Sequence, residues 1–243
     1  MNLKGKTALV TGGAVRVGRA ISQALAGEGM RLVVHYNSSS DDADALVEEI
    51  RRGGGEAAAI GADLSSADAV RRLADEARGI FGGIDVLVNN ASVFPAQRLE
   101  ETDEALWEHT MAVNLRAPFF LIRHLAPVLR ERNGVVVNMC DLAGIQAWGV
   151  YAAHGIAKAG MVHLTKVAAR SLAPDVRVNG IAPGAVLPPE SMGQEELDAL
   201  ARSTPLRRIG SPDDVVRAVL YLVHADYVTG EVLVVDGGRM LRG

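Results

Sequence analysis

Three ionisable side chains lie close together in the sequence between Cys140 and Lys158. Asp141 follows an apolar run, and His154 lies four residues before Lys158. If the chain is helical from Val150 onward, His154 and Lys158 share one helix face, because residues four apart are neighbours on a helix. A carboxylate, an imidazole and an ammonium group would then converge beside a strand end. This set predicts a proton-transfer site, and the alternative is a polar helix start with no chemical role.

Strands and helices must alternate along the chain to position these groups. Apolar runs predict strands at residues 7–11, 31–35, 57–62, 84–88, 134–139, 176–181 and 231–235. Helical periodicity covers residues 16–27, 41–52, 66–81 and 102–130, and another helix begins near Ser211, whereas Pro118 should bend the long helix or lie at a junction. Alternating strands and helices imply parallel pairing with right-handed crossovers. We therefore expect an α/β fold, a single Rossmann-type doubly wound parallel sheet of seven strands flanked by helices on both faces.

We expect residues 1–243 to form a single domain, with one long irregular connection. Residues 185–205 contain Pro188, Pro189 and Gly193 and show no clear periodicity. Long irregular connections in compact domains often cover active sites. The segment is therefore predicted to be a substrate lid, and the alternative is a plain surface loop.

The composition excludes several classes of protein. The chain is 49% hydrophobic with a net charge of −4, and its charges of both signs are interspersed, so we expect no nucleic-acid partner. No apolar run is long enough to predict a membrane span. The N-terminus leads directly into the first strand, so we expect no signal peptide and a cytoplasmic protein. Cys140 is the only cysteine and the six histidines are scattered, so no disulfide and no metal site are expected.

A glycine-rich turn joins the first strand to the first helix. Residues 11–18 read Thr-Gly-Gly-Ala-Val-Arg-Val-Gly. Glycine allows a tight turn and a close backbone approach to a phosphate, and the helix N-terminus supplies free N–H groups. The second strand then ends in the neutral residues Asn37, Ser38 and Ser39, where NAD sites usually carry an acid. With Arg16 nearby, this pattern favours NADP(H) as the cofactor.

Nearly the whole chain, from about Lys6 to Met240, resembles the short-chain dehydrogenase/reductase family. The motifs in family order are Thr11-Gly12 with Gly18, Ala62-Asp63-Leu64, Asn89-Asn90-Ala91-Ser92, Val113-Asn114, Gly134-Val135-Val136-Val137-Asn138, Ala157-Lys158-Ala159, Val176-Arg177-Val178-Asn179-Gly180, Pro183-Gly184 and Val235-Asp236-Gly237-Gly238. Within the family, the chain is most similar to pteridine reductases, including the bacterial dihydrofolate and dihydromonapterin reductases. The features that carry this similarity are Arg16 at a glycine position of the loop, His35-Tyr36 before a polar turn, Phe94 after the Asn-Asn-Ala-Ser motif, and Asp141 where most of the family has a catalytic serine.

The resemblance implies a cofactor site spread along the chain. The residues it implies are Gly12, Arg16, Val17, Gly18, His35, Tyr36, Asn37, Ser38, Ser39, Asp63, Leu64, Asn90, Ala91, Lys158, Pro183, Gly184 and Val186. Ser38 and Ser39 are the candidates for the 2′-phosphate, and Lys158 would hold the nicotinamide ribose. The threonine that usually follows Pro183-Gly184 is missing, so contacts there must differ.

The resemblance also implies an activity, the NADPH-dependent reduction of a C=N bond in a dihydropterin or folate. Phe94 and the nicotinamide would sandwich the flat ring, Ser92 and Arg16 would hydrogen-bond to it, and Asp141 would bind or protonate it. Asn114 would support a water relay. The implied catalytic residues are Asp141, His154, Lys158 and Asn114, and the implied substrate-binding residues are Arg16, Ser92, Phe94, Asp141 and His154.

One position departs from the family. Its catalytic tyrosine lies four residues before the lysine, where this chain has His154, and Tyr151 lies one helical turn earlier. Imidazole has an ordinary pKa of about 6.5, so imidazolium is a competent acid near neutral pH. His154 is therefore predicted as the proton donor, although water held by Arg16 or Asp141 could protonate an imine instead.

Two other functions stay open. One is a carbonyl or 3-oxoacyl reductase, which Asp141 opposes because a carboxylate repels a developing oxyanion. The other is a catalytically weak NADP(H)-binding sensor or partner protein. Helices 106–129 and 150–172 have apolar faces, and the resemblance implies that they pack between subunits, so we expect a homotetramer, with a dimer as second choice. We expect Cys140 to be a buried spectator thiol, and His109 to be structural or solvated.

Overall fold

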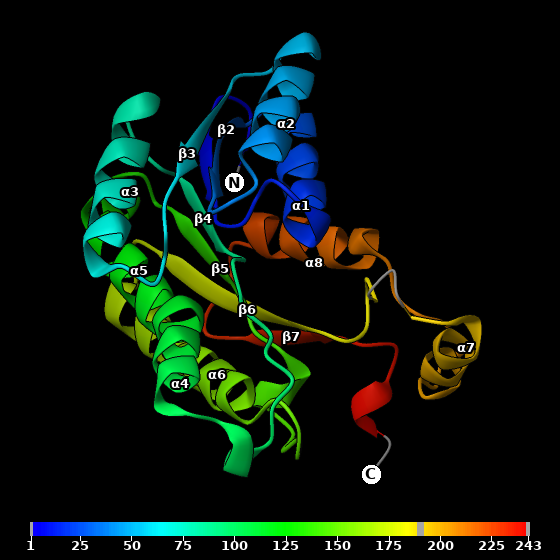
Figure 1. The fold of residues 1–243 in the computed structure, drawn as a ribbon. Coiled ribbons are helices and arrows are strands. Elements are labelled where there is room, and N and C mark those ends of the chain that lie inside the picture. The colour runs from blue at the N-terminus through cyan, green and yellow to red at the C-terminus, as the bar shows by residue number, and fades with distance from the viewer. Residues whose placement is uncertain (1, 189–191, 242–243) are drawn as a thin grey trace.

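A parallel sheet of seven strands forms the centre of the protein (Figure 1). The structure is a computed structural model that describes residues 2–188 and 192–241. The strands are β1 (Thr7–Val10), β2 (Arg31–Tyr36), β3 (Ala57–Gly61), β4 (Val86–Asn89), β5 (Val135–Met139), β6 (Arg177–Pro183) and β7 (Val232–Val235), paired in the order β3-β2-β1-β4-β5-β6-β7. Each lies within two residues of its predicted position, so the predicted fold is confirmed.

Helices cover both faces of the sheet. One layer holds α1 (Arg16–Gly27), α2 (Ser40–Arg52) and α8 (Pro212–His224), and the other holds α3 (Ala67–Ile80), α5 (Ala117–Glu131) and α6 (Ala152–Leu172), with α4 (Glu104–Met111) beside α6 (Figure 1). Each layer encloses its own apolar core. All five residues of β5 are buried, as expected for a strand that is covered on both faces.

The long helix predicted at residues 102–130 is interrupted. α4 ends at Met111, a π-helical turn follows at Ala112–Arg116, and α5 begins at Ala117 with Pro118 in its first turn. Proline is tolerated there because the N–H groups of a first turn have no intrahelical partner. Asn114 lies in the wider π turn, a feature frequently found at functional sites.

The segment 185–205 contains a helix that the sequence reading missed. α7 (Gln194–Arg202) begins where the Glu196 carboxylate accepts the N–H of Gly193 at 2.9 Å, and none of its residues is buried. α7 stands away from the sheet in Figure 1. Residues 189–191, including Pro189, lie outside the described residues. The expectation of a wholly irregular connection is therefore wrong, because local capping and an amphipathic pattern are enough to form a helix here.

The strand order reverses between β1 and β4. β1 pairs with β2 on one side and β4 on the other, so the loops that follow β1 and β4 diverge at their carboxyl ends. Ligands of doubly wound sheets bind in the crevice at such a switch point. In the part of the chain that the structure describes, no helix is both long and apolar enough to cross a membrane.

Candidate functional site

The glycine-rich loop after β1 is held in a tight turn by β2. The N–H of Gly12, which has a φ of +58°, donates to His35 Nδ1 at 3.0 Å. Gly18 lies so close to this loop that a Cβ atom there would overlap the carbonyl oxygen of Gly12. The close approach leaves the N-terminus of α1 open to the crevice. The loop therefore fits the dinucleotide pyrophosphate expected from the sequence.

Substitution of Gly18 by alanine is expected to abolish cofactor binding and destabilise the protein, because the new methyl group must push the Gly12 carbonyl away. Gly27 on the same helix is the matched control, since no atom lies within 4 Å of a Cβ built there. Gly27→Ala should keep cofactor affinity and stabilise α1 by about 0.5–1 kcal/mol. Titration with NADPH and urea unfolding of both variants measure the difference. Equal behaviour of the two variants would contradict this role of Gly18.

His35 is buried and supports the loop from below. Its Nε2 donates to the carbonyl of Ala62 at 2.9 Å while Nδ1 accepts the N–H of Gly12, so the neutral ring satisfies both partners. Burial lowers the pKa of His35 below the ordinary 6.5. His35 faces the crevice, yet both ring nitrogens are occupied by backbone groups.

Stability is expected to fall in acid through His35. Below pH 6.5 the unfolded chain binds a proton at His35 that the folded protein resists, so the free energy of unfolding decreases as the pH drops towards the lowered folded pKa. Urea unfolding between pH 5 and pH 8 should show this slope, and His35→Gln should flatten it. If the variant keeps the wild-type slope, another group causes it.

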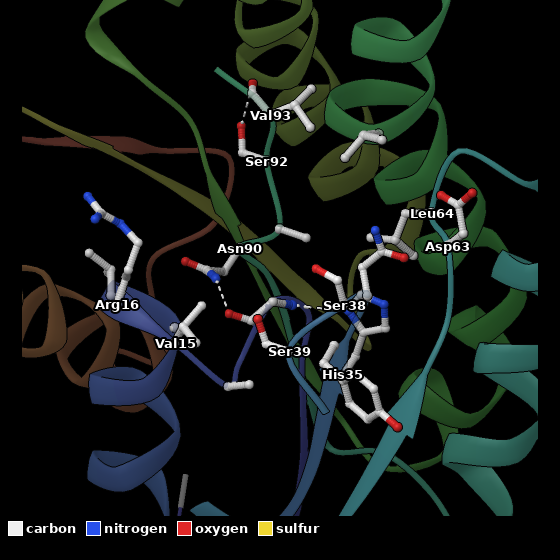
Figure 2. A pocket seen from close by; sticks show the side chains of 18 of the residues that line it. Val15, Arg16, His35, Ser38, Ser39, Asp63, Leu64, Asn90, Ser92 and Val93 are labelled. Carbon is white, nitrogen blue, oxygen red and sulfur yellow. Dashed lines mark hydrogen bonds between the residues drawn. The ribbon is translucent and has the colours of Figure 1, made fainter. Parts of the chain in front are cut away.

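A cavity of about 400 Å³ lies above this loop at the switch point (Figure 2). Its volume falls within the range of small-molecule and cofactor sites. It brings together many of the predicted residues: Gly12, Arg16, Val17, Gly18, His35, Tyr36, Asn37, Ser38, Ser39, Asp63, Leu64, Asn90, Ala91 and Ser92. The end of β2 offers neutral donors to this cavity and no carboxylate.

Five lining residues were not assigned to the site from the sequence: Ala14, Val15, Val93, His109 and Val113. His109 was expected to be structural or solvated, yet it reaches the cavity from α4. It stands near Asp63, whose carboxylate accepts the Ser65 N–H and hydroxyl at 2.8 Å each. These bonds, with a smaller contribution from His109, lower the pKa of Asp63. Only the packing of α4 beside α6 could have revealed this position.

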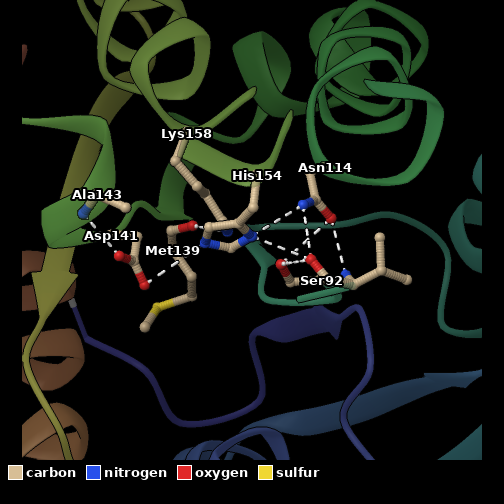
Figure 3. A network of polar contacts seen from close by, with 8 residues as sticks. Ser92, Asn114, Met139, Asp141, Ala143, His154 and Lys158 are labelled. Atoms are coloured by element: carbon tan, nitrogen blue, oxygen red, sulfur yellow. Dashed lines mark hydrogen bonds and ion pairs between the residues drawn. The ribbon is translucent and has the colours of Figure 1, made fainter. Parts of the chain in front are cut away.

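Asp141, His154 and Lys158 converge at the end of β5 (Figure 3). His154 Nε2 lies 3.7 Å from a carboxylate oxygen of Asp141, and the other oxygen accepts the N–H of Ala143 at 2.8 Å. Lys158 Nζ donates to the carbonyl of Met139 at 2.7 Å. Burial lowers the pKa of Lys158. The spacing of these residues along β5 and α6 thus brings them together as predicted.

His154 is buried with its two ring nitrogens in different surroundings. Nδ1 lies 3.2 Å from the amide nitrogen of Asn114 and 3.0 Å from the carbonyl of Val93. Nδ1 can therefore accept a hydrogen bond from Asn114 or donate one to Val93. Nε2 has no hydrogen-bond partner and faces Asp141. The surroundings accommodate both the neutral ring and the imidazolium, which a residue that exchanges a proton requires.

Asn114 fastens the loop after β4 to the same cluster. Its side-chain oxygen accepts the N–H of Val93 at 2.8 Å and the hydroxyl of Ser92 at 3.2 Å, while its amide donates to the Val93 carbonyl at 2.8 Å. Asn90 donates to the carbonyls of Thr11 and Gly12. Both side chains thus connect the strand ends that border the cavity.

The aromatic ring of Phe94 covers His154. It meets the imidazole edge-on at 4.5 Å and stacks on Tyr151 at 4.2 Å with an interplanar angle of 17°. Phe94 is nevertheless 51% exposed. One of its faces rests on Tyr151, and about half of the residue remains accessible to a ligand.

The remaining predicted residues lie apart from the cavity. Pro183 is the last residue of β6, Gly184 follows it, and Val186 lines a second cavity of about 280 Å³. Arg16 connects the two regions, because its guanidinium donates to the carbonyl of Leu187 at 2.6 Å.

In the described ranges, no group of three or more His, Cys, Asp or Glu side chains is arranged to hold a metal ion. Cys140 is buried, and burial raises its pKa to about 11, which suits a spectator thiol.

Comparisons with known proteins place this site in a family. A family model described as enoyl-(acyl carrier protein) reductase matches residues 13–239. A 3-oxoacyl-[acyl-carrier-protein] reductase of Staphylococcus epidermidis is 36% identical over 97% of this chain and 99% of its own length. A 3beta-hydroxysteroid dehydrogenase 1 of Eggerthella lenta is 37% identical over 99% of this chain and 95% of its own.

The solved structures similar to this protein carry names that differ from those of the sequence relatives. The FolM alternative dihydrofolate reductase 1 from Brucella canis, complexed with NADP, superposes with a TM-score of 0.94 at 34% identity and covers 100% of this chain and 96% of that one. A blue fluorescent protein from a metagenomic library, in complex with NADPH, has a TM-score of 0.92 at 32% identity and covers 98% and 99%. The sheet order, the glycine loop and these likenesses along the full length agree: the chain belongs to the short-chain dehydrogenase/reductase family of oxidoreductases.

Proposed function

We propose that this protein is an NADPH-dependent reductase of pterin- or folate-type rings. The observation that carries the proposal is the Asp141–His154 pair beneath the exposed ring of Phe94. The pair offers a carboxylate and a buried imidazole at the position where the family holds a serine and a tyrosine.

The cofactor assignment rests on the crevice after β1. The N-terminus of α1 receives the phosphates, and Ser38, Ser39 and Arg16 supply the donors for a 2′-phosphate where no acid repels it. The NADP and NADPH held by the solved neighbours support this choice. When bound, the cofactor supplies the hydride.

In this proposal the exposed part of the Phe94 ring selects a flat aromatic ring, because two rings in contact bury apolar area on both partners. Asp141 then accepts N–H groups from the ring edge in charge-assisted hydrogen bonds. A pterin presents such an edge, with an amino group beside a ring N–H. A ketone presents none, and its developing oxyanion would be repelled by Asp141.

His154 supplies the proton. Its Nε2 faces Asp141 and the ligand side, while Val93 accepts the Nδ1 proton of the imidazolium. After Nε2 has given up its proton to the reduced C=N nitrogen, Nδ1 keeps its proton and still donates to the Val93 carbonyl. This is general acid catalysis with an imidazole in place of the phenol.

A second candidate is reduction of a 3-oxoacyl thioester, which the Staphylococcus relative favours. Both candidates are tested by measuring NADPH oxidation by the purified protein at pH 5–8. The substrates are a dihydropterin, dihydrofolate and a 3-oxoacyl thioester. We expect turnover of the ring compounds alone. Turnover of the thioester alone would establish the second candidate, and NADPH binding without turnover would indicate a sensor or partner-binding protein.

Two further features belong to this proposal. Residues 185–205 act as the substrate lid, and the bond from Arg16 to Leu187 ties the start of this segment to the nucleotide loop. The homotetramer stays a prediction, with which the exposed Phe119, Ile156 and Val167 on α5 and α6 are compatible.

A further inference from the structure

The C-terminal turn packs beside the loop that follows Asp141. A single 3₁₀ turn, Arg239–Leu241, is fastened there by a hydrogen bond of 3.2 Å from Gln146 Nε2 to the Met240 carbonyl. The guanidinium of Arg239 lies 5.8 Å from the centroid of the Trp148 ring. The turn thus carries a positive charge to the segment between Asp141 and α6.

A continuous series of ring contacts joins this charge to the proposed site. Trp148 meets Tyr151 edge-on at 6.3 Å, Tyr151 stacks on Phe94 at 4.2 Å, and Phe94 meets His154 at 4.5 Å. The series runs from the buried imidazole to the partly exposed guanidinium. The aromatic side chains next to Phe94 therefore lead from the proposed site to a cation.

Arg239 keeps its donors for another partner. Across residues 2–188 and 192–241, no carboxylate lies within ion-pair distance of its guanidinium. Asp236, three residues earlier, accepts the N–H groups of Gly238 and Met240 at 2.7 Å each with its two oxygens. A guanidinium presents a planar fork of N–H donors that matches a carboxylate. In a protein with a net charge of −4, such a cation is also a local attraction for an anion.

We propose that Arg239 is a carboxylate subsite for the anionic tail of the substrate, and that Trp148 and Tyr151 support the aromatic part of that tail. The inference rests on the proposed function and narrows its substrate class. The preferred substrate is a pterin joined to an aromatic, carboxylate-bearing tail, as in a folate, and simple pterins without a tail bind more weakly.

The test compares two ligands and four proteins. Dissociation constants of folate and of unconjugated pterin are measured by calorimetry in the presence of NADP⁺, and KM and kcat are measured for the corresponding dihydro compounds. The proteins are the wild type, Arg239→Gln, and Arg72→Gln as a control on the exposed face of α3. Arg239→Lys tests whether a positive charge without the planar guanidinium group restores folate binding.

Arg239→Gln should weaken folate binding about 10-fold and raise KM for dihydrofolate by a similar factor, with kcat and pterin binding unchanged. Added salt should weaken folate binding to the wild type more than to this variant. Arg72→Gln should match the wild type, and Arg239→Lys should recover part of the loss.

Three outcomes would overturn the inference. In the first, Arg239→Gln leaves folate binding unchanged. In the second, it weakens folate and pterin equally, which indicates a structural role through Trp148. In the third, the wild type binds both compounds equally, and turnover of the dihydropterin would then leave the proposed function standing. Tail-dependent binding without turnover supports the subsite and contradicts the proposed function, and binding of neither compound contradicts both.

Discussion

Replacement of His154 by alanine is expected to lower kcat for a dihydropterin by about 10²- to 10⁴-fold, the usual contribution of a positioned general acid. Nε2 is the ring atom that faces Asp141, and it has no hydrogen-bond partner among the described residues. The affinity for NADPH should change little, because His154 does not line the crevice after β1. Single-turnover kinetics and NADPH titration separate the two effects.

His163→Ala is the matched control, since His163 is an exposed histidine on the same helix. It should leave kcat unchanged. If His154→Ala also retains full activity, the proton comes from water held at Asp141 or Arg16, and His154 is a structural residue.

His154→Tyr restores the residue that is typical of the family. This variant distinguishes a binding protein without activity from an enzyme that uses imidazole. A tyrosine variant that gains activity where the wild type has none would show that the natural protein is a binder. A variant that loses activity would support a site adapted to imidazole, in which Phe94 packs against the smaller ring.

Removal of the charge at Asp141 is expected to change the choice of substrate. Asp141→Asn keeps an oxygen that can accept the Ala143 N–H, so the turn after β5 should persist. The loss of charge-assisted hydrogen bonds to the ring edge should reduce kcat/KM for a dihydropterin by about 10- to 100-fold. Asp141→Ser should have the same effect and also relieve the repulsion of an oxyanion, so reduction of a 3-oxoacyl thioester should rise.

Parallel assays of the wild type and both variants with the two substrates provide the measurement. Asp103→Asn is a suitable control, because Asp103 likewise accepts a backbone N–H, that of Leu106, at the start of α4. If Asp141→Asn and Asp141→Ser keep the wild-type preference, Asp141 does not select the substrate. The pterin assignment would then lose the observation that carries it.

The known relatives illustrate why single residues must decide the substrate. The Staphylococcus and Eggerthella proteins act on different substrates by name, yet both are about as similar to this chain as the Brucella reductase. A shared fold hosts many activities, and the chemistry depends on the site. In this chain, we propose that Asp141, His154 and Phe94 distinguish the possibilities.

Local patterns in the sequence determined the sheet, most helices and the central cluster. Each strand is a short apolar run, and the helix pattern supplies the crossover that makes neighbouring strands parallel. Asp141 follows the end of β5 by two residues, while His154 and Lys158 are one turn apart on α6, so their meeting follows from short-range spacing. The glycine loop was identified for the same reason, because its residues are consecutive.

Only the tertiary structure decided which distant residues join this cluster. The π turn that aims Asn114 at Val93, the arrival of His109 at the cavity and the stacking of Phe94 on Tyr151 depend on how α4 and α6 pack together. Arg239 reaches Trp148 across 91 residues of sequence because the strand order puts β7 at the sheet edge, and the chain after it then packs back beside the Asp141 loop. Periodicity reports which face of an element is apolar. It carries no information about which side chain of another element lies opposite. Those contacts between elements determine which ligand atoms the site residues can reach and which substrate the site selects.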